Sequence, residues 1–198
     1  MCNLYTQTKS PDEIAAIFRD LQMPLLFPEG APNLQPRDIA ITDPGPIVLA
    51  SKTQPGSYDL IARRWSWPQS AGKPLYNLRA DGRDFPRDRA IAIADGFYEF
   101  TAPADPKAKR KDRWVFRPTG FPILGIAALV RHAPEVGEAF TLLTMPPGPD
   151  VAPLHSRQIV ILPPEQWPAW LDGTARSADL FQPLPEGTLS VAPAPRGD

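Results

Sequence analysis

The chain has 198 residues, of which 42% are hydrophobic, and its formal net charge at neutral pH is −1. These values predict one folded domain over residues 1–198, with its core over about residues 2–192, and exclude a disordered or fibrous chain. The single cysteine excludes an internal disulfide framework. No basic-then-apolar leader and no apolar run of about 18 residues is present, so we expect a cytoplasmic or nucleoid-associated protein without a membrane segment.

The first elements expected along the chain are a short strand and a capped helix. Residues 2–6 have a strand-like composition. Ser10 is expected as the helix N-cap, and Glu13 at the third helical position completes a capping box. The apolar residues that follow have the spacing of one buried stripe, at Ile14, Ile17, Phe18 and Leu21. Four prolines at positions 24, 28, 32 and 36 then predict an irregular, extended segment.

Strand patterns dominate the rest of the chain. The expected strands cover residues 39–42, 46–51, 58–65, 90–100, 114–117, 123–130, 140–145, 158–162 and 189–192. The polar run 102–112 is expected as a hairpin tip, and residues 164–171 as a short helix that Gly173 ends. The order of elements predicts an α+β fold with a β-rich, barrel-like core and a few peripheral helices.

Residues 90–100 carry an alternation that bears on chemistry. If the strand is unbroken, one face carries Ile91, Ile93, Asp95, Phe97 and Glu99. Glu99 would then be desolvated, its pKa would be raised, and it would suit proton transfer. Gly96 is expected as a bulge or a point of close approach. The alternative is that Gly96 breaks the alternation and leaves Glu99 exposed.

The only cysteine is residue 2, directly after Met1. Removal of Met1 would create a 1,2-aminothiol, whose amine can condense with an aldehyde and whose thiol can then close a thiazolidine ring. Alternatively, the thiol can act as a nucleophile with its own α-amine as the base. An α-amine titrates near ~7.7–8.0 and a thiol near ~8.5, so both reactive forms exist near neutral pH. The simpler interpretation is an inert, buried thiol.

Charge is distributed unevenly along the chain. Residues 63–117 contain 13 Lys and Arg against 7 Asp and Glu, which gives this stretch a positive charge and leaves the rest negative. One face could therefore attract phosphates, and a mixed, solvated surface is the alternative. The candidate nucleic-acid contacts are Arg63, Arg64, Trp65, Trp67, Arg79 and Arg83, with Arg87 and Arg89 as further backbone contacts. The two tryptophans could stack on unpaired bases or pack in the core.

The sequence contains no pattern for a metal or a cofactor. Its two histidines lie far apart and its cysteine is single, so no ligand spacing is recognisable. There is also no phosphate-binding loop and no dinucleotide fingerprint. We therefore expect a protein without metal or cofactor.

Four segments and the opening Met1-Cys2 share their order and spacing with a known family. They read Trp-Ser-Trp-Pro over 65–68, Tyr-Asn-Leu-Arg-Ala over 76–80, Ala-Asp-Gly-Phe-Tyr-Glu-Phe over 94–100, and Leu-His-Ser-Arg over 154–157. Over residues 2–192 the chain resembles the SRAP family, the SOS response-associated peptidases, which are also described as abasic-site processing proteins.

The resemblance implies a monomeric DNA-repair protein that removes its own Met1, binds single-stranded DNA and cross-links to an abasic site. The amine of Cys2 would attack the sugar aldehyde, and its thiol would close the thiazolidine. Glu99 would transfer protons and take part in removing Met1, and His155 would act on the sugar hydroxyl or the leaving oxygen. Asn77 would position the cysteine and the adduct, and Arg79 would contact a DNA phosphate.

The chain also departs from the family pattern. The family commonly begins Met-Cys-Gly-Arg-Phe, whereas this chain has Asn3, Leu4 and Tyr5, and so loses a basic side chain at position 4. The usual Trp-Gly is Trp-Ser at residues 65–66. These changes leave the core chemistry in place and put the detailed DNA contacts in question.

Two other classes of function fit the same residues. An N-terminal nucleophile amidohydrolase also begins Met-Cys and uses Cys2 with its own amine, and glutamine hydrolysis would identify it. A non-covalent single-strand binder or partner-binding module would leave Cys2 without a role. Salt-sensitive DNA binding that is unaffected by Cys2→Ala would identify that class.

Overall fold

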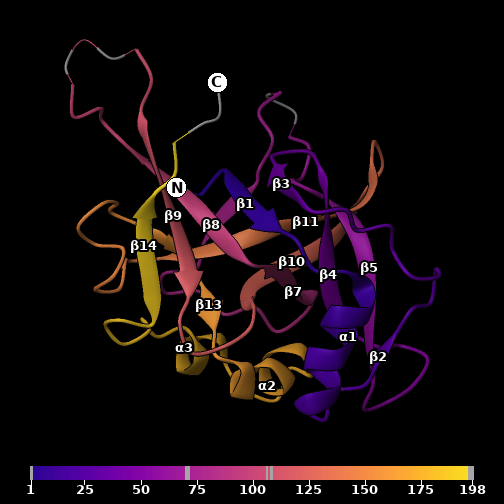
Figure 1. Cartoon of the computed structure of the whole chain (residues 1–198). Coiled ribbons are helices and arrows are strands. Elements are labelled where there is room, and N and C mark those ends of the chain that lie inside the picture. The colour runs from indigo at the N-terminus through magenta and orange to yellow at the C-terminus, as the bar shows by residue number, and fades with distance from the viewer. Residues whose placement is uncertain (1, 70–71, 106, 108, 196–198) are drawn as a thin grey trace.

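β-Strands form most of the regular structure. The computed structural model describes residues 2–69, 72–105, 107 and 109–195 (Figure 1). The strands are β1 (Leu4–Gln7), β2 (Leu25–Leu26), β3 (Arg37–Ala40), β4 (Pro44–Ala50), β5 (Tyr58–Trp65), β6 (Asn77–Arg79), β7 (Arg89–Ala94), β8 (Gly96–Thr101), β9 (Asp112–Pro118), β10 (Leu124–Ala133), β11 (Gly137–Met145), β12 (Gln158–Ile159), β13 (Ile161–Leu162) and β14 (Leu189–Pro193). The helices are α1 (Pro11–Asp20), the 3₁₀ turn η1 (Pro164–Gln166), α2 (Trp167–Leu171) and α3 (Ser177–Leu180).

Five strands of the larger sheet close into a barrel. Their order is β11-β10-β7-β4-β5, and β5 returns to β11 through a parallel pairing of Trp65 with Phe140. The short strands β6 and β12 extend from β11, β13 pairs with β10, and β2 pairs with β5. The structure thus confirms the predicted β-rich, barrel-like α+β fold.

A second sheet of five strands has the order β14-β9-β8-β1-β3. The N-terminal strand β1 lies between β3 and β8, and Tyr5 of β1 is paired with Phe97 of β8. Strands β8 and β9 form the predicted hairpin, and residues 106 and 108 of its predicted tip lie outside the described residues. This sheet therefore brings the start of the chain next to the strand that carries Glu99.

The expected continuous strand over residues 90–100 is broken at Asp95. Strand β7 belongs to the barrel and β8 to the second sheet, so the chain changes sheets between them. The expectation that Glu99 shares a face with Ile91 and Ile93 was wrong. The buried residues form two hydrophobic clusters, and these isoleucines belong to one of them whereas Phe97 of β8 belongs to the other. The alternative of an exposed Glu99 was also wrong, since Glu99 is 1% exposed.

Gly96 sits at this change of sheet and is a point of close approach, as predicted. A Cβ on Gly96 would lie 2.6 Å from the carbonyl oxygen of Phe116 in β9. A side chain at this position would push β8 and β9 apart. The glycine thereby allows Glu99 to enter the second sheet at its buried register.

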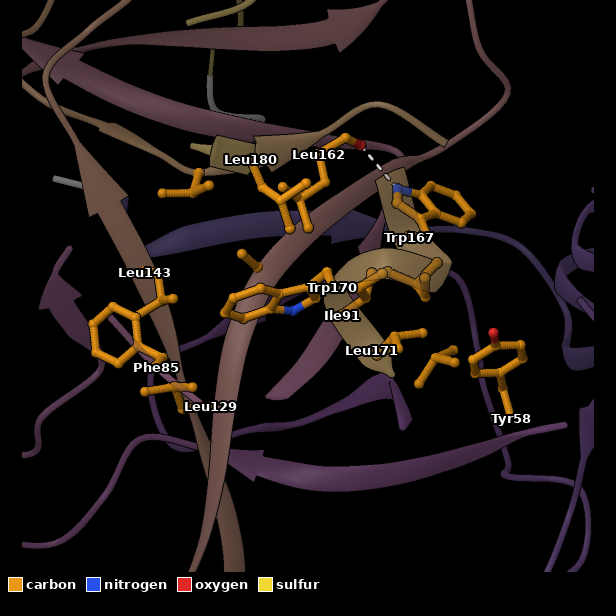
Figure 2. Packing of buried hydrophobic residues seen from close by; sticks show 14 of the residues in the cluster. Tyr58, Phe85, Ile91, Leu129, Leu143, Leu162, Trp167, Trp170, Leu171 and Leu180 are labelled. Carbon is orange, nitrogen blue, oxygen red and sulfur yellow. Dashed lines mark hydrogen bonds between the residues drawn. The ribbon is translucent and has the colours of Figure 1, made fainter. Parts of the chain in front are cut away.

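The helices contribute to one of the two hydrophobic clusters, the one that contains Ile91 and Ile93 of β7. Figure 2 shows Trp167 and Trp170 of α2 among these residues. Their indole nitrogens donate to the carbonyl oxygens of Leu162 and Ala90, both at 2.8 Å, and so fix the helix against the strands. The predicted helix over 164–171 is present as η1 and α2, and no helix of the described residues is long and apolar enough to cross a membrane.

The predicted N-terminal helix is also present. The Ser10 backbone nitrogen donates to a Glu13 carboxylate oxygen at 2.7 Å, and the Ser10 hydroxyl accepts from the Glu13 backbone nitrogen at 3.3 Å. Ile14 and Phe18 are fully buried, whereas Leu21 is 36% exposed at the C-cap. The buried stripe is therefore shorter than the spacing predicts.

Candidate active site

Cys2 lies buried, with 1% of its surface exposed, next to the first residue of β6. The Asn77 side-chain nitrogen Nδ2 donates to the carbonyl oxygen of Cys2 at 2.6 Å, and the Cys2 thiol donates to the carbonyl oxygen of Leu4 at 3.3 Å. Asn77 is held by the parallel pairing of β6 with β11, where it lies opposite Leu142. The barrel thereby positions the side chain that holds the cysteine backbone.

Glu99 and His155 face each other beside the cysteine. Carboxylate oxygen Oε2 of Glu99 lies 3.7 Å from Nε2 of His155. Burial raises the pKa of Glu99 to about 7. Burial also lowers the pKa of His155, and the positive charge of Lys111 lowers it further. Near neutral pH the site therefore combines a neutral imidazole with a carboxyl group that is close to half protonated.

The cysteine thiol is electrostatically linked to the same carboxylate. Burial raises the pKa of Cys2 far above its ordinary value, and the negative charge of Glu99 raises it further. The thiol is therefore protonated near neutral pH, and a nucleophilic step needs a base that removes its proton. Glu99 is the carboxylate whose charge acts on that thiol.

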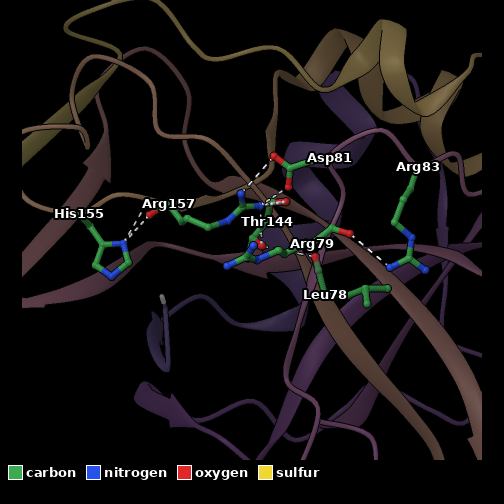
Figure 3. Close-up of polar contacts among 7 residues, drawn as sticks. All are labelled: Leu78, Arg79, Asp81, Arg83, Thr144, His155 and Arg157. Atoms are coloured by element: carbon green, nitrogen blue, oxygen red, sulfur yellow. Dashed lines mark hydrogen bonds and ion pairs between the residues drawn. The ribbon is translucent and has the colours of Figure 1, made fainter.

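Backbone groups of Arg157 hold the imidazole of His155 (Figure 3). Nδ1 of His155 lies 2.8 Å from the Arg157 carbonyl oxygen and 3.1 Å from its backbone nitrogen. If Nδ1 carries the proton and donates it to the carbonyl, Nε2 faces Glu99 as an acceptor. The Arg157 guanidinium in turn donates to Asp81 at 2.6 Å and to the Thr144 carbonyl at 2.8 Å.

A sequence model described as SOS response associated peptidase (SRAP) matches residues 1–196 of this chain. The chain belongs to the SRAP family. Members of this family are associated with abasic-site processing, and the family name links them to the SOS response to DNA damage. No curated protein matches the chain.

Solved structures share the SRAP fold seen here. A protein from Bordetella bronchiseptica has a TM-score of 0.76 at 20% identity, and the match covers 98% of this chain and 100% of that one. A phage-related protein from the same organism has a TM-score of 0.71 at 21% identity, covering 98% and 95% of the two chains. A Bacteroides thetaiotaomicron protein has a TM-score of 0.72 at 15% identity, covering 97% and 91%.

The four candidate catalytic residues of this SRAP chain come from four separate segments and meet at one place. They are Cys2 before β1, Asn77 in β6, Glu99 in β8 and His155 in the loop before β12. Asn77 is hydrogen-bonded to Cys2, and His155 faces Glu99. The charge of Glu99 acts on the Cys2 thiol and so links the two pairs.

The candidate base-stacking tryptophans of the SRAP chain are core residues. Trp65 is fully buried and its indole nitrogen donates to the Tyr76 carbonyl oxygen at 2.9 Å. Trp67 is 7% exposed and donates to the Ala139 carbonyl oxygen at 2.8 Å. The expectation that they stack on DNA bases was therefore wrong, because both rings complete hydrophobic clusters of the barrel.

Two of the candidate phosphate-binding arginines are committed to protein contacts. Arg63 pairs with Glu29 at 2.5 Å and with Glu138 at 2.9 Å, so its charge is neutralised. Arg89 is 7% exposed and donates to the carbonyl oxygens of Trp170 and Ala175. Burial contradicts the expected contact of Arg89 with DNA, whereas the contact expected of Arg63 stays a prediction.

The remaining arginine candidates differ in exposure. Arg64 is partly buried and makes a long 3.4 Å contact with the Thr42 carbonyl oxygen. Arg79 and Arg83 are exposed on and just after β6, the strand that carries Asn77 (Figure 3). Arg87 is also exposed. Arg79, two residues after Asn77 in β6, is thus the exposed candidate that lies closest to Asn77 along the chain.

Sequence reasoning missed three residues next to the site. Asp81 fixes Arg157, Lys111 acts on His155, and Trp114 lies directly opposite Glu99 in the β8–β9 ladder. The hairpin prediction could have located Trp114, because residues on paired strands face each other once the register is known. No group of three or more acidic, histidine or cysteine side chains among the described residues could hold a metal ion.

Proposed function

We propose that this SRAP protein forms a covalent thiazolidine cross-link between Cys2 and the aldehyde of an abasic site in single-stranded DNA. The reactive form is the chain from which Met1 has been removed, because only that chain carries the α-amine and the thiol on adjacent carbons. The protein would act as a monomer without a metal or cofactor. This reaction would hold abasic sites in a covalent adduct during the DNA-damage response.

The convergence of Asn77, Glu99 and His155 on Cys2 is the observation that carries this proposal. Each of these side chains has a chemical use in aldehyde condensation: one orients the residue 2 backbone, and two exchange protons. A buried thiol alone would be an inert core residue. A buried thiol beside a carboxyl group that titrates near neutral pH supports acid–base chemistry.

The first step joins the α-amine of Cys2 to the C1′ aldehyde of the opened sugar. Nitrogen attacks carbon, and the resulting hydroxyl leaves as water after it takes a proton, which gives an iminium ion. The protonated form of Glu99 would donate that proton. His155, as a neutral imidazole, would take or return the proton of the sugar hydroxyl when the ring opens.

The second step closes the ring. The Cys2 sulfur adds to the iminium carbon, and the thiol proton passes to the carboxylate form of Glu99. Amine, thiol and aldehyde thus give a thiazolidine and one water. With the pKa of Glu99 at about 7, both the acid needed in the first step and the base needed in the second are populated near neutral pH.

Removal of Met1 precedes this chemistry. Hydrolysis of the Met1–Cys2 peptide bond adds one water and frees methionine and the new α-amine. We infer that the protein performs this hydrolysis itself, with Glu99 as the general base for the attacking water. The hydrogen bond from Asn77 to the Cys2 carbonyl would keep residue 2 in place after the bond is broken.

A denaturing gel with a single-stranded oligonucleotide that carries one abasic site tests the proposal. The wild-type protein should give a slow band that survives denaturation, and Cys2→Ala should not. A stable wild-type band that Cys2→Ala also gives, or no wild-type band, would contradict the proposal. Glutamine hydrolysis by the protein without any band would instead favour an amidohydrolase.

A further inference from the structure

We propose that a groove beside the candidate active site, lined by Arg110, Lys111 and Trp114, holds the nucleotide next to the abasic sugar. The Trp114 indole would stack on the unpaired base of that nucleotide, and the two cations would contact the flanking phosphates. This inference rests on the proposed function. Trp65 and Trp67 are buried, whereas Trp114 is partly exposed and could contact a base.

Trp114 lies on the same face of the second sheet as the catalytic carboxyl group. It is directly opposite Glu99 in the β8–β9 ladder, and side chains of directly opposed residues project to the same side. Its indole nitrogen donates to the Thr101 hydroxyl at 3.0 Å, which fixes the ring along the hairpin. The ring also packs against the hydrophobic cluster that contains Cys2.

Trp114 differs from the other four tryptophans of the chain in its exposure. Trp65, Trp167 and Trp170 are fully buried and Trp67 is 7% exposed, whereas Trp114 is only partly buried. A partly exposed aromatic ring with cations nearby is the kind of side chain that single-strand binders use for base stacking.

The groove is lined by residues at the base of the β8–β9 hairpin and by the end of β14, which pairs with β9. Its volume is about 540 Å³, and its lining includes Pro193, Ala194 and Pro195, the first of which is paired with Trp114. Trp114 lines this groove and is paired with Glu99 in the β8–β9 ladder, so the groove adjoins the strand that carries the candidate proton donor. Lys111 also lines the groove, and its positive charge acts on His155. The groove therefore opens beside the position that the abasic sugar would occupy.

The charges in the groove favour a phosphate. Among the described residues Arg110 is exposed and takes part in no ion pair, so it is available to a ligand. The groove also contains Asp112, but its carboxylate accepts a hydrogen bond from the Ala104 backbone nitrogen at 2.9 Å. Arg113 donates to the carbonyl oxygens of Ala194 and Pro195.

A single strand fits this combination better than a duplex. Stacking on Trp114 needs a base whose face is open, and a base next to an abasic site has lost a stacking neighbour. Aromatic stacking and nearby cations together give affinity with little dependence on base sequence. The groove would thus bind purine and pyrimidine bases alike. By holding the nucleotide next to the abasic site, it would place the abasic sugar near Cys2.

Binding of an undamaged single-stranded oligonucleotide tests the groove without the covalent chemistry. Wild-type tryptophan fluorescence should be quenched on binding, since Trp114 is the partly exposed ring. Trp114→Ala should lose the quenching and weaken affinity by about 5- to 150-fold, while Trp114→Phe should keep most of the affinity because phenylalanine still stacks. Unchanged affinity of Trp114→Ala, or quenching that persists in it, would overturn the proposal.

The salt dependence of the same binding tests the two cations. Arg110→Gln with Lys111→Gln should reduce the slope of log affinity against log salt by about 1.4, since each phosphate contact on a single strand contributes about 0.7. Lys52→Gln is the matched control, because Lys52 is exposed and lines a different cavity, and its slope should stay at the wild-type value. An unchanged slope in the double variant would overturn this part of the proposal.

Failure of the groove and failure of the proposed function give different results. Cys2→Ala should bind undamaged DNA with wild-type affinity but form no stable adduct. Trp114→Ala should form the adduct more slowly at low DNA concentration and approach the wild-type rate at saturation. If wild type forms no adduct but the groove variants still lose binding, the proposed function fails and the groove stands. If Trp114→Ala matches wild type at every DNA concentration, the groove fails.

Discussion

Replacing the buried carboxyl group of Glu99 with an amide should change how stability depends on pH. The pKa of Glu99 in the folded chain is about 7, above its ordinary value of 4.5. A raised folded pKa means that the contribution of Glu99 to stability is full below the unfolded pKa and is lost as pH rises through about 7. Glu99→Gln has no proton to lose and should not show this decline.

The size of the effect follows from the same values. One pKa unit corresponds to about 1.4 kcal/mol, so ionising Glu99 should cost the wild-type fold on the order of 2–3 kcal/mol between pH 5 and pH 8. For a chain of this length about 1 kcal/mol moves Tm by roughly 2–4 °C. The wild-type Tm should therefore fall by about 5–10 °C more than that of Glu99→Gln over this range.

Thermal melts followed by circular dichroism in matched buffers measure this difference. Glu165→Gln serves as the control, because it removes an exposed carboxylate and should leave the wild-type pH dependence unchanged. Parallel curves for wild type and Glu99→Gln would show instead that Glu99 ionises in the folded chain as easily as in the unfolded one.

Three further substitutions have expected outcomes. Ser66 is buried at a φ of +116°, a conformation that favours glycine, so Ser66→Gly should raise the free energy of unfolding by about 1–3 kcal/mol in urea titrations; a lower value would contradict this strain. Asp81→Asn should release Arg157 and slow adduct formation by up to about fivefold, with a shifted pH profile, and an unchanged profile would show that this pair does not position His155. Cys2→Ala, once Met1 is removed, should still form an imine that borohydride traps on the gel; absence of the trapped band would exclude the α-amine as the attacking group.

Local sequence signals predicted the elements that depend on neighbouring residues. The capping box at Ser10 and Glu13 located α1, and the polar run after Phe100 located the hairpin. These features depend on hydrogen bonds and turns within a few residues. Residues further apart in the sequence, such as Cys2 and Asn77, were associated only through the family resemblance.

Long-range pairing explains what the sequence did not reveal. Strand β6 has three residues and forms because β11 offers it a parallel edge, which no local pattern around Asn77 indicates. The sequence around Arg63 suggests a free cation, and only the folded chain shows that Glu29 and Glu138 pair with it. The switch between sheets at Asp95 likewise depends on two sheets that form from distant segments.

The tryptophans illustrate the same limit. Trp65 and its neighbours have a composition that fits both a core and a base-binding surface, and burial depends on closure of the barrel by β5 and β11. Trp114 lies in an alternating strand whose partner register decides that it faces Glu99. The side chain that is open to a ligand could therefore be distinguished only in the folded chain.

Intact mass spectrometry of the protein after incubation with a single-stranded oligonucleotide that carries one abasic site tests the central claim most directly. The expected species has the mass of the chain without Met1 plus the oligonucleotide minus one water, and no adduct should retain Met1. An adduct that still contains Met1, or none from protein shown by mass to lack Met1, would contradict the claim that the amine and thiol of Cys2 act together.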